Sequence, residues 1–153
     1  MNTSMLVFVL WLLAAPVFHV GLCHAGEMAD EYLLQERCGK RAQEVFDKSN
    51  PKQITRDENG IESSTYTNHY NKRLNKCFAV ITVIFISKDK SKSGSYKQVQ
   101  LYDINENKEY GVLFTEIDFL PQAQYKPIQC TFLTTQCQSQ EEWSTLAKPY
   151  MEE

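Results

Sequence analysis

The residues whose types are suited to chemistry gather in one stretch, which reads Tyr-Thr-Asn-His-Tyr-Asn-Lys-Arg-Leu-Asn-Lys-Cys from Tyr66 to Cys77. It is the densest cluster of aromatic and hydrogen-bonding groups in the chain. In a strand, side chains two apart share a face, so an open face here would present a rigid amphipathic surface typical of binding sites. The alternative is structural, with tyrosines covering a sheet edge and amides capping a turn. The predicted binding residues are Tyr66, Asn68, His69, Tyr70 and Lys72.

Histidine is too scarce for most catalytic constellations. His69 is the only histidine after residue 25, so a serine or cysteine nucleophile would have to use it as the base. The chain contains no GxSxG, HExxH, P-loop or GxGxxG motif. The pattern favours a binding protein without a cofactor. A small hydrolase, with His69 beside a carboxylate or tyrosine, remains the alternative.

The first residues are typical of a secretory signal peptide. An uninterrupted apolar run from Met5 to Ala15 has the length of a signal core and is short for a membrane span. Small side chains at Cys23 and Ala25 place the cleavage site after Ala25. Two alternatives stay open: a retained anchor, because no Lys or Arg precedes the run, and lipidation of Cys23. We therefore predict a signal peptide at 1–25 and one periplasmic or secreted domain at 26–153, with no stable membrane insertion.

Four cysteines remain after the predicted cleavage: Cys38, Cys77, Cys130 and Cys137. An even number in an oxidising compartment predicts two disulfides. Of the three possible connectivities we favour Cys38 with Cys77, which would tie an N-terminal helix to the sheet, and Cys130 with Cys137, which closes a short loop. The chain has no CxxC motif, so we do not expect a metal site.

The net charge of the chain indicates which classes of partner are favoured. The formal net charge is −3, and residues 1–25 contain no Lys, Arg, Asp or Glu, so the balance belongs to the exported part. Nucleic acids and anionic membranes are bound through clustered cations, which a weakly acidic chain does not favour. We expect a protein partner and no nucleic acid.

Periodicity predicts a helix, a set of strands and a second helix. Apolar residues at Leu34, Cys38, Ala42 and Val45 form the stripe of a helix over 28–48. Residues 52–63 have turn chemistry and are expected to be a loop. Strands are expected at 64–71, 77–86, 96–103, 109–117 and 128–134, with 77–86 as a central strand covered on both sides. A capping box at Ser139 begins the last helix. The fold class is α+β, with an antiparallel meander of four to five strands between the helices and two disulfides.

Several short runs together carry a resemblance. They are Tyr66 to Phe78, Leu101-Tyr-Asp103, Lys108-Glu-Tyr-Gly111, and the C-terminal Cys137, Glu141-Glu-Trp143 and Tyr150-Met-Glu152. This signature resembles a group of small uncharacterised secreted proteins of bacteria over most of the exported part. The resemblance implies a bacterial exported protein and no known activity.

The leading hypothesis is a periplasmic or secreted protein-binding module, of inhibitor or immunity type, with the stretch from Tyr66 to Lys76 as its contact surface. Its support is the absence of catalytic motifs and the disulfide-closed scaffold. The alternatives are the His69 hydrolase and a structural protein of the cell envelope. A pocket containing His69 would favour the hydrolase, and a sheet fully covered by helices would favour the envelope protein.

Overall fold

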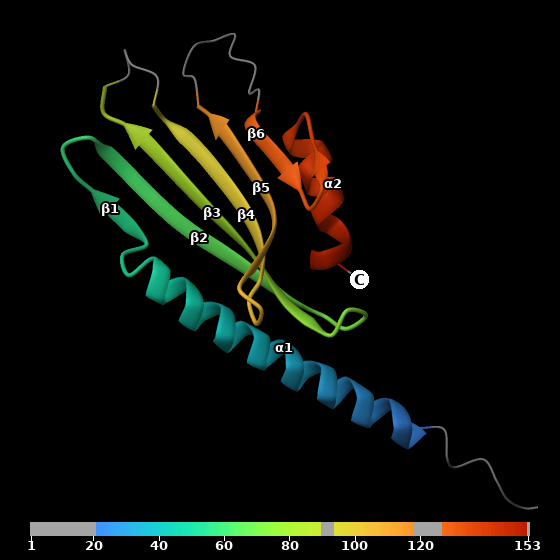
Figure 1. Cartoon of the computed structure of the whole chain (residues 1–153). Helices are drawn as coiled ribbons and strands as arrows, with labels where there is room; N and C mark the ends of the chain where they lie inside the picture. Colours follow the sequence, from blue (N-terminus) through green and yellow to red (C-terminus); the bar gives the residue numbers. More distant parts are fainter. Residues whose placement is uncertain (1–20, 90–93, 118–126, 153) are drawn as a thin grey trace, which may run out of the picture. The chain divides into compact units, whose positions relative to one another are not determined.

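A computed structural model describes residues 21–89, 94–117 and 127–152, with side chains described from Met28 onward (Figure 1). The chain divides into two compact units, Met1–Tyr32 and Leu33–Glu153. Residues 1–20 of the predicted signal peptide lie outside the described residues. The backbone is helical from Gly21 and therefore through the predicted cleavage point after Ala25. Within the described ranges, no helix combines the length and apolar character needed to cross a membrane.

Helix α1 (Gly21–Ser49) confirms the predicted stripe. Cys38 and Ala42 are buried, and the next turn adds a fully buried residue, Phe46. Asn50 follows the last residue of the helix. Its backbone N–H makes a final helical bond to the Phe46 carbonyl at 2.7 Å, and its side-chain amide donates to the same carbonyl at 3.2 Å. Pro51 follows, and the residue before a proline is disfavoured in helical conformation.

A single antiparallel sheet follows, and its strands lie side by side in sequence order. They are β1 (Ile54–Arg56), β2 (Gly60–Asn71), β3 (Lys76–Ser87), β4 (Tyr96–Asp103), β5 (Lys108–Glu116), β6 (Pro127–Phe132) and β7 (Thr135–Gln136). The predicted α+β meander is confirmed. The sheet has seven strands rather than four to five, because short strands, β1 and β7, lie at its two edges.

The expectation of a loop at 52–63 is wrong. The Asp-Glu-Asn-Gly sequence there closes a hairpin between β1 and β2, whose register pairs Ile54 with Ser63. The turn is stabilised by Asp57, whose carboxylate accepts hydrogen bonds from the N–H groups of Asn59 and Gly60 at 2.8 and 2.9 Å. Turn chemistry was recognised in the sequence, but such a turn can also join two strands.

Helix α2 (Gln140–Met151) begins with the predicted capping box. Ser139 Oγ accepts a hydrogen bond from the Glu142 N–H at 3.1 Å, and the Glu142 carboxylate accepts one from the Gln138 N–H at 2.7 Å. Trp143 and Ala147 are buried one turn apart against the sheet. The two aromatic residues of this helix, Trp143 and Tyr150, are therefore part of the core.

The two helices pack against opposite faces of the sheet, as the alternation of β3 shows. Phe78 belongs to the core cluster that contains Trp143 of α2, whereas Cys77 and Ala79 belong to the cluster that contains Cys38 and Ala42 of α1. Both predicted disulfides are confirmed. Cys38 is bonded to Cys77 and Cys130 to Cys137, with Cα–Cα distances of 5.3 and 5.0 Å.

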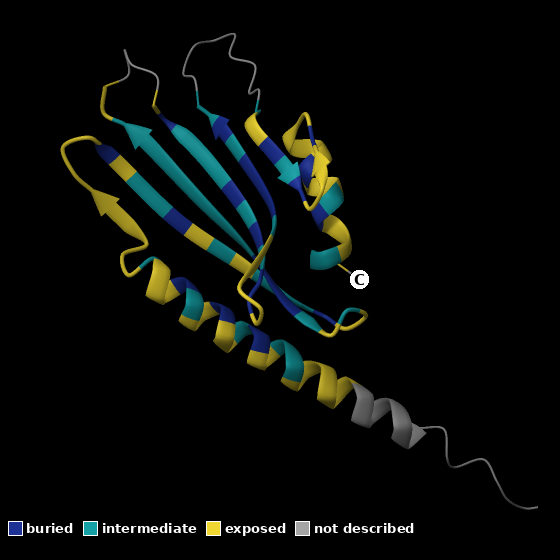
Figure 2. Ribbon diagram, in the orientation of Figure 1, coloured by how far each residue is buried: buried dark blue, intermediate teal, exposed yellow. Residues whose placement is uncertain are grey.

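The prediction that β3 is covered on both sides holds only near its start. Cys77, Phe78 and Ala79 are buried, but every residue from Val80 to Ser87 is half-exposed (Figure 2). The buried side chains of α1 lie over Cys77 and Ala79, so the later residues on that face extend past them. The sheet continues beyond the cover that the described helices supply.

Candidate functional site

Three of the predicted binding residues face helix α1. Tyr66, Asn68 and Tyr70 are half-buried on one face of β2. The Tyr66 ring lies 4.6 Å from the ring of Phe46, and Asn68 Nδ2 lies 3.7 Å from Cys38 Sγ. The Tyr70 hydroxyl donates to Asn75 Oδ1 at 2.8 Å and so supports the turn before β3. These side chains join β2 to α1, and their face of the strand is not open there.

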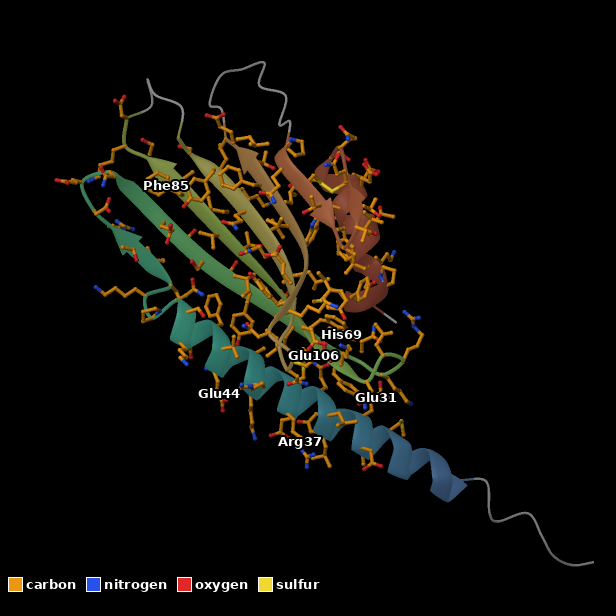
Figure 3. All side chains as sticks on the ribbon, viewed as in Figure 1. Glu31, Arg37, Glu44, His69, Phe85 and Glu106 are labelled. Atoms are coloured by element: carbon orange, nitrogen blue, oxygen red, sulfur yellow. A yellow bond between two sulfur atoms is a disulfide. The ribbon has the colours of Figure 1, made fainter. Side chains whose placement is uncertain are left out.

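The other two predicted residues lie elsewhere. His69 is on the opposite face of β2, where its register partner is Phe78. Its Nε2 atom is buried and has no hydrogen-bond partner among the described residues. Lys72 is exposed in the turn after β2 and lines a shallow hollow with Arg73, Pro149 and Glu152. Figure 3 labels His69 among the side chains on the ribbon. The five predicted residues therefore do not converge on one site.

Two further observations concern His69 and the residue types that bind metal ions. A nucleophile–base pair needs hydrogen-bonded side chains, and the buried Nε2 of His69 has no such partner in the described part of the chain. Nor do the described residues bring together three or more His, Cys, Asp or Glu side chains in a group that could hold a metal ion.

A different surface lies on the α1 side of the sheet, beyond the buried side chains of the helix. We call it the open face and define it as the half-exposed side chains Ile81, Val83, Phe85, Tyr96 and Phe114. The register places them on one face: Ile81 is opposite Tyr66, Phe85 is opposite Tyr96, and Phe114 is opposite Gln98, two residues from Tyr96. In Figure 2 this half of the central strands is coloured mainly as half-exposed.

Three of these side chains form an aromatic row across neighbouring strands. The ring centroids of Phe85 and Tyr96 are 5.5 Å apart, and those of Tyr96 and Phe114 are 5.2 Å apart. The row continues over Gly60 of β2, where an added Cβ would lie 2.7 Å from the Phe85 ring. The missing side chain of Gly60 therefore leaves room for the ring of Phe85, which comes from the adjacent strand β3. Packing within the row fixes the rings, so the surface is pre-formed.

A carboxylate at the border of the row, that of Glu62, affects the ionisation of Tyr96. The Tyr96 hydroxyl donates to Glu62 Oε2 at 3.2 Å. Burial raises the pKa of Tyr96, and the negative charge of Glu62 and this hydrogen bond raise the pKa further. Tyr96 is consequently a neutral phenol at physiological pH, with a carboxylate beside it. The open face is therefore an aromatic row with a neutral amide, Gln98, between Val83 and Phe114, and with a carboxylate at its border.

A hollow of about 260 Å³ adjoins the open face and shares Ile81 and Val83 with it. Val45 and Asn50 close it on the α1 side, and Gln100 lies across from them. It is therefore apolar at its base with amide groups around it. Sites for drug-sized ligands usually occupy roughly 300–1,000 Å³, so this hollow suits a side chain of a partner better than a whole small molecule.

A buried ion pair holds one wall of this hollow. Lys76 Nζ lies 2.6 Å from Asp103 Oδ2 and 2.8 Å from Glu106 Oε1, and Asp103 is fully buried. The other oxygen of Asp103 accepts the N–H groups of Asn105 and Glu106 in the turn between β4 and β5. The two carboxylates raise the pKa of Lys76 well above its usual value, and the hydrogen bond that Lys76 donates to Asp103 is the largest cause. All these groups are satisfied, so their role is structural.

Fold and site together define a class: an α+β domain closed by two disulfides, with a pre-formed aromatic surface on one face of its sheet. No protein-family model, curated protein or solved structure matches the chain. The resemblance drawn from the sequence signature therefore remains a prediction.

Sequence reasoning missed the open face. Phe85, Tyr96 and Phe114 come from three strands, and their shared position depends on the register between those strands. One signal was available. The run from Cys77 to Ile86 is apolar on both faces although one domain supplies only two helices to cover them.

Proposed function

We propose that this protein is an exported protein-binding module of inhibitor or immunity type, acting in the periplasm or outside the cell. The observation that carries the proposal is the open face. Contiguous apolar side chains that stay half-exposed on the central strands of a sheet commonly mark an interaction site. Ile81, Val83, Phe85, Tyr96 and Phe114 would contact the partner.

Export is supported by the cysteines and by the N-terminal run. Disulfides persist in oxidising compartments, and the bonds Cys38–Cys77 and Cys130–Cys137 pair all four cysteines that follow the predicted signal peptide. The apolar run from Met5 to Ala15 has the composition of a signal core. Periplasmic or secreted localisation follows as part of the proposal.

The chemistry of the open face favours a protein as the partner. Protein interfaces are enriched in aromatic residues and depleted of charge at their centre, with polar residues around the rim. Phe85, Tyr96 and Phe114 supply such a centre, and Glu62 lies at its border. A surface already fixed by strand pairing loses little conformational freedom on binding, which suits a protein that blocks another by occupying its surface.

The two alternatives receive less support. A hydrolase based on His69 needs an acid or hydroxyl partner at the imidazole, and Nε2 has none in the described residues. A structural envelope protein would be favoured by a fully covered sheet, whereas β3 is half-exposed from Val80 to Ser87.

The test is a comparison of baits. The disulfide-bonded protein is used to capture partners from the cells and medium of its source, in parallel with a Phe85→Ala/Tyr96→Ala double variant. Ile128→Ala is the matched control, because Ile128 is an exposed apolar residue (63%) on β6, which is separated from β4 by β5. We expect one partner to be retained by the control and weakened at least about tenfold by the double variant. A partner held equally by all three baits would contradict the open face as the contact surface.

A further inference from the structure

The outer edge of β2 is only partly paired. β2 extends from Gly60 to Asn71, but β1 pairs only with Ile61, Glu62 and Ser63. Among the described strands none lies beside the rest of this edge, because β1 is the outermost strand of the sheet. About half of a long strand therefore has no neighbour on its outer side.

Two hydrogen bonds show which backbone groups point outward. The Ser64 N–H donates to the Gln53 carbonyl at 2.8 Å, and the Tyr70 N–H donates to Gln35 Oε1 of α1 at 2.7 Å. In an antiparallel strand, alternate residues direct both the N–H and the C=O to the same side. Tyr66 and Asn68 lie between these two positions with the same parity, so their N–H and C=O groups also point outward.

The two bonds also mark the ends of the unpaired edge. Gln53, just before β1, pairs with the Ser64 N–H through its carbonyl. At the other end, the Gln35 side chain accepts the Tyr70 N–H in place of a neighbouring strand. Between them lie five residues, 65–69, which span about 17 Å of extended chain at 3.3–3.4 Å per residue. On the α1 face of β2, Cys38 contacts the Asn68 side chain, and Gly39 beside it is close enough that an added Cβ would lie 3.7 Å from Asn68 Nδ2.

Proteins protect edge strands with Lys, Pro, bulges, very short strands or a covering helix or loop. Helix α1 packs against side chains on one face of β2, and among the described residues its hydrogen bond to an outward backbone group is at Tyr70, outside residues 65–69. Residues 63–71 contain no Lys, Arg, Asp, Glu or Pro. The register between β2 and β3 is regular from Gly60 to Asn71, whereas the pairs β4–β5 and β5–β6 both contain a register shift. The edge is long, regular and uncharged.

We propose that the outer edge of β2 at residues 65–69 binds an extended peptide segment of a partner protein, which adds a strand to the sheet. The N–H and C=O groups of Tyr66 and Asn68 bond to alternate residues of that segment. Recognition is therefore mainly through the peptide backbone, as in other cases of strand addition. The site is separate from the open face and does not depend on it.

The test uses five-to-ten-residue peptides selected on the disulfide-bonded protein from a random-sequence display library. Asn68→Pro removes the outward N–H, and proline is tolerated at an edge position whose N–H faces away from the sheet. Asn68→Ala is the matched control, since it keeps that N–H and removes the contact with Cys38. We expect selected peptides to bind Asn68→Pro at least about tenfold more weakly and Asn68→Ala within about twofold of the wild type.

A second measurement needs no variant of the protein. N-methylation of single peptide residues should weaken binding at every other position, because only alternate N–H groups of an added strand point to β2. Amide hydrogen exchange of Tyr66 and Asn68 should slow on peptide binding. The proposal is overturned if selection yields only peptides that bind Asn68→Pro as tightly as wild type, or if N-methylation shows no period of two.

The two binding proposals can fail separately. The Phe85→Ala/Tyr96→Ala variant should bind the selected peptides as the wild type does, because neither side chain lies on the β2 edge. Weakened peptide binding in this variant would place the peptides on the open face and contradict the strand-addition site. Loss of the captured partner without loss of the peptides would separate the two surfaces.

Discussion

The two faces of the sheet differ in how well a helix covers their large apolar side chains. On the α2 side, large residues such as Phe78, Leu101 and Leu113 are fully buried, and Phe78 and Phe132 make edge or tilted ring contacts with Tyr150. On the α1 side, the buried residues of β3 are small, Cys77 and Ala79, and the tyrosines that surround them are only half-buried.

Helix α1 comes close to the sheet at its disulfide. The Cα atoms of Cys38 and Cys77 are 5.3 Å apart, as the bond between them requires. Three large residues of that face, Phe85, Tyr96 and Phe114, lie outside the α1 cluster and remain half-exposed. The two faces therefore differ in how much of their large apolar surface a helix covers.

The comparison predicts the largest difference for two phenylalanines on the same strand. Phe78→Ala should lower the free energy of unfolding by about 3–5 kcal/mol, because it leaves a cavity in a sealed core. Phe85→Ala should cost about 1 kcal/mol, mainly its ring contacts with Tyr96. Urea unfolding followed by circular dichroism measures both. Equal costs would show that the α1 side is as well covered as the α2 side.

The disulfides should follow next, in the order of the loops that they close. By the chain-entropy relation, replacing Cys38 and Cys77 with alanine should cost about 4 kcal/mol, because their sequence separation is 39. Replacing Cys130 and Cys137, whose separation is 7, should cost about 2.5 kcal/mol. Thermal unfolding of the two double variants tests the order. The reverse order would mean that α1 is held to the sheet mainly by side-chain packing.

Asn71 tests how much the hydrogen bonds between the end of β2 and helix α2 contribute to stability. This residue is 1% exposed, and its side chain donates to the Pro149 carbonyl of α2 at 3.0 Å while accepting from the Leu74 N–H at 2.9 Å. Asn71→Leu removes both bonds, so the half-buried Leu74 N–H loses its acceptor and, among the described residues, the Pro149 carbonyl keeps only its longer contact with Arg73, at 3.5 Å. We expect a loss of about 1–3 kcal/mol in urea unfolding. Ser144→Ala, at an exposed position of α2, is the control for a general effect of substitution on this helix.

The smallest effect concerns the ionisation of Tyr96 on the open face. Its ordinary pKa is 10.0, and burial followed by the charge of Glu62 raises it. Because the folded-state pKa lies above the unfolded value, this contribution to stability is complete below about pH 10 and is lost as the pH rises above it. Glu62→Gln should lower the pKa of Tyr96 toward its ordinary value without reaching it, since burial remains. NMR titration of the Tyr96 ring carbon measures this, and an unchanged pKa would contradict the contact with Glu62.

Much of the local structure could be predicted from the sequence, because its causes are local. The stripe through Cys38 and Ala42, the capping box at Ser139 and the alternation around Tyr66 depend on residues within a few positions of each other. The favoured disulfide pairing is confirmed, although the sequence by itself left three connectivities possible.

The candidate surfaces were decided by the tertiary structure. That Tyr66 and Asn68 lie beneath α1 depends on the position of a helix about thirty residues away along the chain. The aromatic row depends on the register of three strands, and the unpaired edge of β2 depends on where β1 ends. Periodicity tells which side chains share a face, but it does not tell what covers that face. Coverage is set by contacts between residues far apart in sequence, which no local pattern encodes.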